Sequence, residues 1–222
     1  MSRDENGKKL DGSKKAAKAY LANLEITKVE YELASLERTH ETEELTHKLV
    51  IAQEHNSGTF RLYGSVDMSS VERLRLNTAR YATAYPGEPI TLVISSPGGS
   101  VFDGWVLFDH LRALSAQGHK ITTIVRGMAG SMAAILTQAG DTRIIGPESY
   151  LVIHEPSSVA WGKTSDLIDE LDVMKRLTRQ AEDIFARRSK LSAKEIKAKT
   201  LKKDWYIGAK ESKALGFSDK IG

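Results

Sequence analysis

Along most of the chain, apolar residues follow one of two spacings, which predict strands and helices in alternation. Short unbroken apolar runs such as ITLVIS and YLVI are typical of buried strands, and apolar residues three or four positions apart are typical of amphipathic helices. Such alternation indicates an α/β fold with a largely parallel sheet and right-handed crossovers. The expected strands are residues 59–64, 90–95, 121–125, 142–145 and 150–154, and the expected helices are 69–84, 100–117, 132–139, 164–188 and one that begins at Ser192.

Polar residues mark where two of these helices begin. Ser69 with Glu72, and Ser192 with Glu195, have the spacing of a capping box, in which a hydroxyl and a carboxylate satisfy free N–H groups of the first turn. The dipeptide Pro86-Gly87 is expected to end the first of these helices.

The N-terminal quarter of the chain has a different pattern. Residues 1–15 are polar and are expected to form a mobile tail. Residues 16–47 have helical spacing among balanced charges and predict an arm helix, which is either solvated or in contact with a partner subunit. Residues 48–63 predict a hairpin that turns at Asn56-Ser57-Gly58. The expected domains are the tail (1–15), the arm and hairpin (16–58) and a main domain (59–222).

Composition narrows the class of protein without identifying it. The 222 residues are 41% hydrophobic and 27% charged, as in globular proteins, and the net charge of +3 does not by itself call for nucleic acid or a membrane. The absence of cysteine excludes disulfides, thiolate metal sites and a cysteine nucleophile. No uncharged apolar run reaches the ~18 residues of a membrane-spanning helix. We therefore expect a cytoplasmic protein without a membrane partner.

Two strand-to-helix turns consist mainly of small residues. Pro97-Gly98-Gly99 and Gly127–Ser131 should both lie at the carboxyl edge of the parallel sheet, where sites of α/β proteins gather. The glycines leave backbone amides accessible, and Ser131 lies at the start of a helix. Either turn alone is explained by tight packing, but together they offer a nucleophile beside an oxyanion hole.

A serine nucleophile needs a base, and one of the six histidines is placed to serve. His154 ends the apolar strand YLVI, and imidazole titrates near neutrality. The acid that would orient it stays open at this point. The candidates that follow His154 in the sequence are Glu155, Asp166, Asp169 and Asp204, the last of them directly before the aromatic pair Trp205-Tyr206.

Five motifs occur in order along residues 60–222, namely FRLYG, LVISSPGGSVFDG, VRGMAGSMAAIL, YLVIHEP and KKDWYIGAKESKALGFSD. Their order and spacing resemble the ClpP-like serine peptidases, the proteolytic subunits of Clp proteases and their phage-encoded relatives. The resemblance implies an α/β, ClpP/crotonase-like fold with a helical handle at about 164–188. The N-terminal arm and hairpin diverge from the family.

The resemblance also implies roles for individual residues. Ser131 is the nucleophile, His154 the base and Asp204 the acid, and the amides of Gly98 and Met132 form the oxyanion hole. No metal or organic cofactor is implied. An extended substrate would add as a strand along the segment formed by Gly98, Gly99, Ser100 and Val101.

Partners follow from the same resemblance. Family members form homo-oligomers of two stacked rings, usually heptameric, around a chamber that admits peptides and unfolded proteins, which an AAA+ ATPase threads in. Residues 1–58 do not resemble the segment that engages the ATPase, so phage capsid proteins are the alternative partner. Lys203 replaces the arginine that usually precedes the acid, and Glu155 replaces the commoner glutamine.

Three alternatives stay open. The first is a crotonase-like acyl-CoA hydratase or isomerase, in which two backbone amides hold a thioester enolate. The second is a non-catalytic assembly protein that uses the arm and the basic segment 187–203. That segment has eight Lys or Arg and one acid, which favours a solvated helix over a nucleic-acid surface. The third is a Ser–Lys peptidase of the signal-peptide-peptidase type, which is disfavoured because the sequence shows no membrane anchor.

Overall fold

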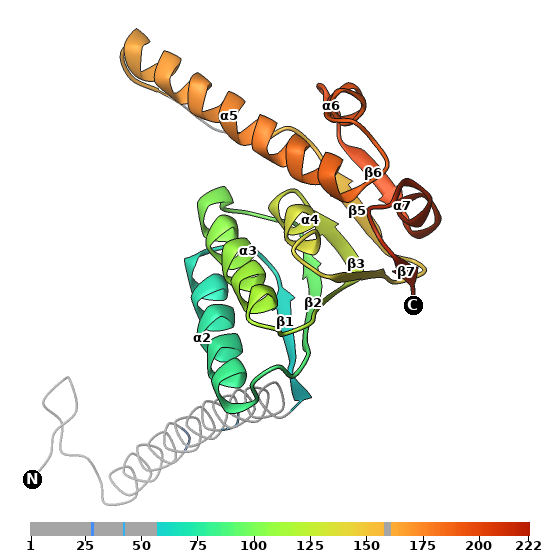
Figure 1. Ribbon diagram of the computed structural model, residues 1–222. Helices are drawn as coiled ribbons and strands as arrows, with labels where there is room; N and C mark the ends of the chain where they lie inside the picture. The colour runs from blue at the N-terminus through green and yellow to red at the C-terminus, as the bar shows by residue number, and fades with distance from the viewer. Residues whose placement is uncertain (1–27, 29–41, 43–56, 158–160) are drawn as a thin grey trace, which may run out of the picture. The chain divides into compact units, whose positions relative to one another are not determined.

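The structure, a computed structural model, describes residues 28, 42, 57–157 and 161–222 (Figure 1). The chain divides into two units, residues 1–52 and 53–222, and the fold below is that of the described part of the second unit. Of the expected tail and arm helix only Lys28 and Thr42 are described, and both are helical. The remainder of these segments and the first strand of the expected hairpin lie outside the described residues, so the expected domain division stays a prediction.

The centre of the unit is a seven-stranded sheet. The hydrogen-bonded order is β1-β2-β3-β4-β7, with β5 paired to β3 and β6 paired to β5. Every pair is parallel except β5 with β6, which confirms the predicted α/β class with a largely parallel sheet. The strands are β1 (Thr59–Tyr63), β2 (Ile90–Ser96), β3 (Ile121–Gly130), β4 (Thr142–Ile145), β5 (Tyr150–Ile153), β6 (Trp205–Gly208) and β7 (Lys220–Ile221).

Six helices of the described region connect or flank these strands. They are α2 (Met68–Ala84), α3 (Val101–Ala116), α4 (Met132–Thr137), α5 (Thr164–Arg188), α6 (Ala193–Thr200) and α7 (Ala209–Leu215). Ser100 caps α3 and Ser192 caps α6 with a reciprocal bond to Glu195, as predicted. β6 and β7 did not emerge from periodicity, because strands of four and two residues are too short to show one.

The start of α2 differs from the prediction. Asp67, rather than Ser69, is the N-cap, and its carboxylate accepts from the amide of Ser70 at 2.8 Å while the Ser70 hydroxyl accepts from the Asp67 amide at 3.1 Å. Glu72 instead pairs with Arg75 at 2.8 Å. Aspartate caps helices as well as serine does, so the earlier of two suitable residues begins the helix.

The predicted strand at 59–64 is present as β1, but its partner in the described region is β2, to which it runs parallel. Ser57 is helical, and Gly58 has a φ of +62°. A Cβ at Gly58 would lie 2.6 Å from the hydroxyl oxygen of Tyr81 and 2.8 Å from the carbonyl oxygen of Pro89, which requires glycine there. Gly58 therefore leads into a strand that runs parallel to β2, and the other half of the predicted hairpin lies outside the described residues.

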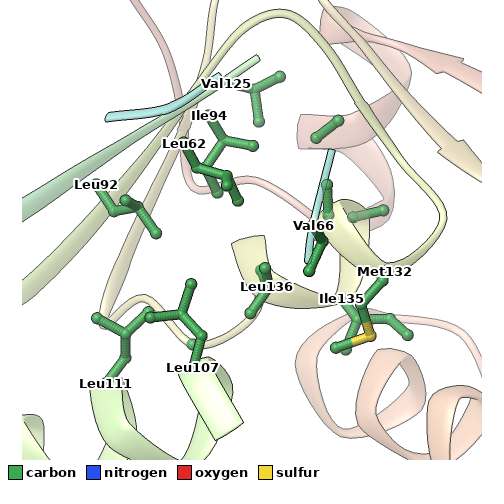
Figure 2. Close-up of a cluster of buried hydrophobic side chains, with 14 of the residues drawn as sticks. Leu62, Val66, Leu92, Ile94, Leu107, Leu111, Val125, Met132, Ile135 and Leu136 are labelled. Atoms are coloured by element: carbon green, nitrogen blue, oxygen red, sulfur yellow. The ribbon is translucent and has the colours of Figure 1, made fainter. Parts of the chain in front are cut away.

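Part of the core, shown in Figure 2, lies between the sheet and the helices α3 and α4. All six residues of α4 are buried, and Leu136 points between the sheet and α3. Burying a side chain of this size contributes about 1.5–3 kcal/mol, so α4 is held by packing on every side rather than by helix propensity. The labelled members of this cluster are Leu62, Val66, Leu92, Ile94, Leu107, Leu111, Val125, Met132, Ile135 and Leu136.

Helix α5 has the predicted bounds but only its C-terminal end joins the core. Its two buried residues are Ile184 and Phe185. Figure 1 shows the helix extending beyond the sheet. Its N-terminal half leaves apolar side chains largely exposed, among them Leu167, Ile168 and Leu171. An exposed apolar row of this length is typical of a surface that is covered in an assembly.

Candidate active site

The strand that leads to Ser131 is longer than the sequence predicted. We expected β3 to end at residue 125 and a turn to occupy Gly127–Ser131. Instead Met128–Gly130 continue the strand and pair in parallel with Tyr150–Val152. Small residues permit this close pairing as well as they permit a turn, so the strand ends only at Ser131.

Ser131 is the single residue between β3 and α4, and its backbone is unusual. Its φ and ψ are 51° and −125°. Among the described residues other than glycine, only Ser131 and Lys202 have a positive φ. The Ser131 amide donates to the carbonyl of Val152 at 2.8 Å, which holds the turn against β5. A serine on a strained strand-to-helix turn presents its hydroxyl at the edge of the sheet, a placement found for nucleophiles in α/β hydrolases.

The two small-residue turns come together. Gly98 has a φ of +100°, and a Cβ added there would lie 2.6 Å from both the Cβ of Ser131 and the carbonyl oxygen of Gly130. The same Cβ would lie 3.1 Å from the amide nitrogen of Met132. Met132 opens α4, so its N–H is one of the free donors of the first turn. Gly98 thus lies beside both Ser131 and the first residue of α4.

The loop that contains Gly98 is held as a short strand. The Val66 amide donates to the Gly98 carbonyl, and the Ser100 amide donates to the Val66 carbonyl, both at 2.8 Å. Since backbone groups alternate along an extended segment, the N–H and C=O of Gly99 point away from Val66. The Gly98 amide itself donates to the hydroxyl of Ser96 at 3.1 Å. Gly99 therefore offers the unoccupied backbone edge of this loop.

His154 and Asp204 meet at the end of an antiparallel ladder. β5 and β6 pair through Ile153 and Trp205, so the residue after β5 and the residue before β6 are neighbours. The His154 Nδ1 lies 3.8 Å from an Asp204 carboxylate oxygen, beyond hydrogen-bond length, and the two side chains are 31% and 57% exposed. A carboxylate facing Nδ1 leaves Nε2 as the ring nitrogen that can accept a proton.

Of the other acidic candidates, Glu155 and Asp166 have structural partners and Asp169 is exposed. Glu155 accepts a hydrogen bond from the Lys202 amide at 3.0 Å and so holds the turn, with Lys202 at a φ of 57°, that leads to Asp204. Asp166 accepts from the Lys163 amide at the start of α5. Asp169 is an exposed residue of the same helix. Within the described region, Asp204 is the acid that forms an ion pair with His154.

Ser131 and His154 line one pocket of about 100 Å³. Its walls come from α3, α4, α5 and α6, and of these wall residues only Val101 and Met132 were predicted from the sequence to belong to the site. No local signal identifies the other apolar wall residues, because each has the character of an ordinary core residue. The wall residues are Val101, Trp105, Met132, Ile135, Ile153, Leu177, Ala181, Phe185 and Ile196, with the polar Thr178, Glu182 and Thr200.

Comparison with known proteins gives a consistent picture. A family model described as Clp protease matches residues 43–222. ATP-dependent Clp protease proteolytic subunit 3 of Rhodococcus jostii is 30% identical over 165 residues, which cover 73% of this chain and 80% of that relative. The ATP-dependent Clp protease proteolytic subunit of Bacteroides fragilis is 33% identical over 138 residues, covering 61% of this chain and 65%, just under two thirds, of the relative.

A mostly parallel α/β sheet is consistent with a ClpP/crotonase-like fold, and a serine and a histidine line one pocket at the ends of two of its strands. Because the family model spans most of its length, the chain belongs to the Clp protease family. The predicted resemblance is thereby confirmed. Membership points to a serine peptidase and, in general terms, to a homo-oligomer.

Two further properties concern metal binding and the membrane. Across residues 57–157 and 161–222, no group of three or more His, Asp or Glu side chains is placed to hold a metal ion. None of the helices that the structure describes is both long and apolar enough to cross a membrane.

Proposed function

We propose that this protein is a serine endopeptidase in which Ser131, His154 and Asp204 act as a triad. The observation that carries the proposal is the placement of Ser131, at a positive φ between β3 and α4, in the same pocket as His154. Asp204 faces the opposite nitrogen of the imidazole. These placements support a triad in the order hydroxyl, imidazole, carboxylate.

The chemistry follows from this order. His154 Nε2 takes the hydroxyl proton as Ser131 Oγ attacks the carbonyl carbon, and the C–N bond breaks as the imidazolium gives that proton to the leaving amine. A water then repeats the sequence and releases the acyl group. Asp204 holds the imidazole in the useful tautomer and stabilises its charged form. The 3.8 Å separation would shorten when substrate closes the site, since catalytic hydrogen bonds are often long without ligand.

Backbone amides would stabilise the oxyanion. Met132 supplies one donor from the first turn of α4. Gly98 supplies the second only after it leaves the Ser96 hydroxyl, and Gly99, which lines the pocket, is the alternative donor in the same turn. Losing one such donor typically lowers the rate by ~10²–10³.

An extended peptide would bind as an added strand along Gly98–Val101. The free edge at Gly99 supplies backbone hydrogen bonds that do not depend on the substrate's sequence. Val101 lines the pocket, so a side chain next to the scissile bond would enter it.

We also propose that the exposed apolar row of α5 packs against a second copy of the chain. Family membership supports a homo-oligomer, and stacked rings around a chamber would keep the triad from folded proteins. Leu171→Asp should lower the native mass, because a charge cannot be buried unpaired in an apolar interface. Native mass spectrometry measures this, with the exposed Asp172→Asn as control. An unchanged assembly in Leu171→Asp, or a monomer in the unmodified protein, would contradict the proposal.

The direct test of the nucleophile is labelling with a serine-reactive fluorophosphonate. We expect one adduct, on Ser131, and no adduct in Ser131→Ala. Ser157 lines the same pocket and is the matched control, so Ser157→Ala should label normally. Labelling elsewhere, or none in the assembled protein, would refute the triad. If saturable binding of a CoA thioester accompanied that result, the hydratase or isomerase would replace the peptidase, and salt-sensitive binding of capsid protein or nucleic acid would favour an assembly role.

A further inference from the structure

The pocket beside Ser131 is electrostatically one-sided. Its walls include two carboxylates, Glu155 and Glu182, but no lysine or arginine among the residues of the described chain that line it. A site intended only for aliphatic side chains has no use for a carboxylate, because removing a charge from water is costly unless it is paired. The composition of the pocket therefore points to a ligand group of positive charge.

Glu182 is the carboxylate without a direct partner. It is partly buried on α5, and in the described part of the chain no hydrogen bond or ion pair within 4.0 Å reaches it. Glu182 also lines the outer groove in which Lys175, Arg179 and Lys197 lie, so this residue is at the boundary between pocket and groove. The basic side chains line the groove and not the pocket.

Burial raises the pKa of Glu182, and the balance of neighbouring charges does not cancel this effect. The positive charges of Lys197 and, more weakly, Arg179 lower this pKa. The negative charges of Asp183 and Glu155 raise it further. A raised pKa means that the surroundings disfavour the charged form. A cation bound in the pocket would restore that lost stabilisation.

The two threonine hydroxyls that line the pocket present acceptors rather than donors. The hydroxyl of Thr178 donates to the carbonyl of Met174 at 2.8 Å, and that of Thr200 donates to the carbonyl of Ile196 at 3.1 Å. Their protons are engaged, so their lone pairs are what the pocket can offer. Together with Glu182 they suit a group that only donates hydrogen bonds, such as an ammonium or a guanidinium.

We propose that Glu182 is a specificity-determining residue, and that the pocket prefers lysine or arginine at the substrate position just before the scissile bond. The apolar walls, including Trp105, Ile135 and Phe185, would cover the methylene stem, while the cation reaches Glu182. The inference rests on the proposed function, because Ser131 must be the residue that attacks at the mouth of the pocket.

The test compares fluorogenic peptides that differ only in that position, with lysine, arginine, leucine or glutamate. We expect the unmodified protein to prefer the basic peptides. Glu182→Gln should lower the ratio of kcat/KM for the lysine and leucine peptides by about tenfold, since one partly exposed charge pair is lost. Asp183→Asn removes the same charge from the exposed neighbouring residue and should leave the ratio unchanged. Glu182→Lys should shift the preference toward glutamate.

The outcomes separate this inference from the function on which it rests. Efficient cleavage of the leucine peptide by Glu182→Gln shows that the variant is folded. An unchanged lysine-to-leucine ratio in that variant then overturns the role of Glu182 and leaves the peptidase intact. If the unmodified protein cleaves none of the peptides and Ser131 takes no fluorophosphonate label, the proposed function fails, and the specificity inference fails with it.

Discussion

Replacing His154 with alanine should lower kcat/KM for peptide hydrolysis by about 10⁴-fold or more, because the serine hydroxyl then has no base. His154→Ala combined with Ser131→Ala should be hardly worse than either alone, since the two residues act on the same proton. Steady-state hydrolysis of a leucine-containing fluorogenic peptide measures both effects. His110→Gln is the matched control, because His110 lies on α3 outside the pocket and bonds to Thr78.

The acid is tested in the same assay. Asp204→Asn keeps the shape of the side chain but loses the charge that stabilises the imidazolium, so activity should fall strongly. A fully active Asp204→Asn variant would reassign the acid to Glu155, Asp166 or Asp169. Activity retained in His154→Ala would instead remove the basis of the whole mechanism.

The largest expected loss of stability follows from Phe217→Ala. Phe217 is fully buried, and its ring packs edge-on against Phe185 of α5 at 5.7 Å and Trp205 of β6 at 5.6 Å. Truncating such a residue removes buried apolar surface and leaves a cavity, which costs about 3–5 kcal/mol. Urea unfolding followed by circular dichroism gives the free energy of unfolding directly.

Phe102→Ala provides the comparison, because the Phe102 ring is 66% exposed and its loss leaves no cavity. A loss of unfolding free energy below about 1 kcal/mol for Phe217→Ala would show that the packed rings of Phe185, Trp205 and Phe217 do not stabilise the fold. The residual activity of the folded Phe217→Ala protein should also fall, because Trp205 directly follows Asp204 in the chain and helps to position it.

Local patterns were sufficient where the structure is determined by neighbours in sequence. The bounds predicted for α5 are those observed, because helical hydrogen bonds join residues four apart and a 25-residue amphipathic pattern is unmistakable. β4 and β5 also lie where apolar runs predicted strands.

Local patterns failed where a distant segment selects between two plausible conformations. Gly130 suits a turn as well as a strand, and pairing with β5 makes it strand. Asp67 and Ser69 are both suitable caps, and helix α2 begins at the earlier one. β6 is a strand because it pairs with β5. Its four residues are too few to show a periodicity in the sequence.

The candidate site divides along the same line. Residue types and motif order were enough to place the chain in its family and to select a serine, a histidine and four possible acids, because chemistry depends on which groups are present. Which acid faces the imidazole, which glycine has an unused amide and which helices wall the pocket with Glu182 depend on contacts between segments up to dozens of residues apart. Such contacts are set by packing of the whole domain, and no stretch of sequence read alone contains them.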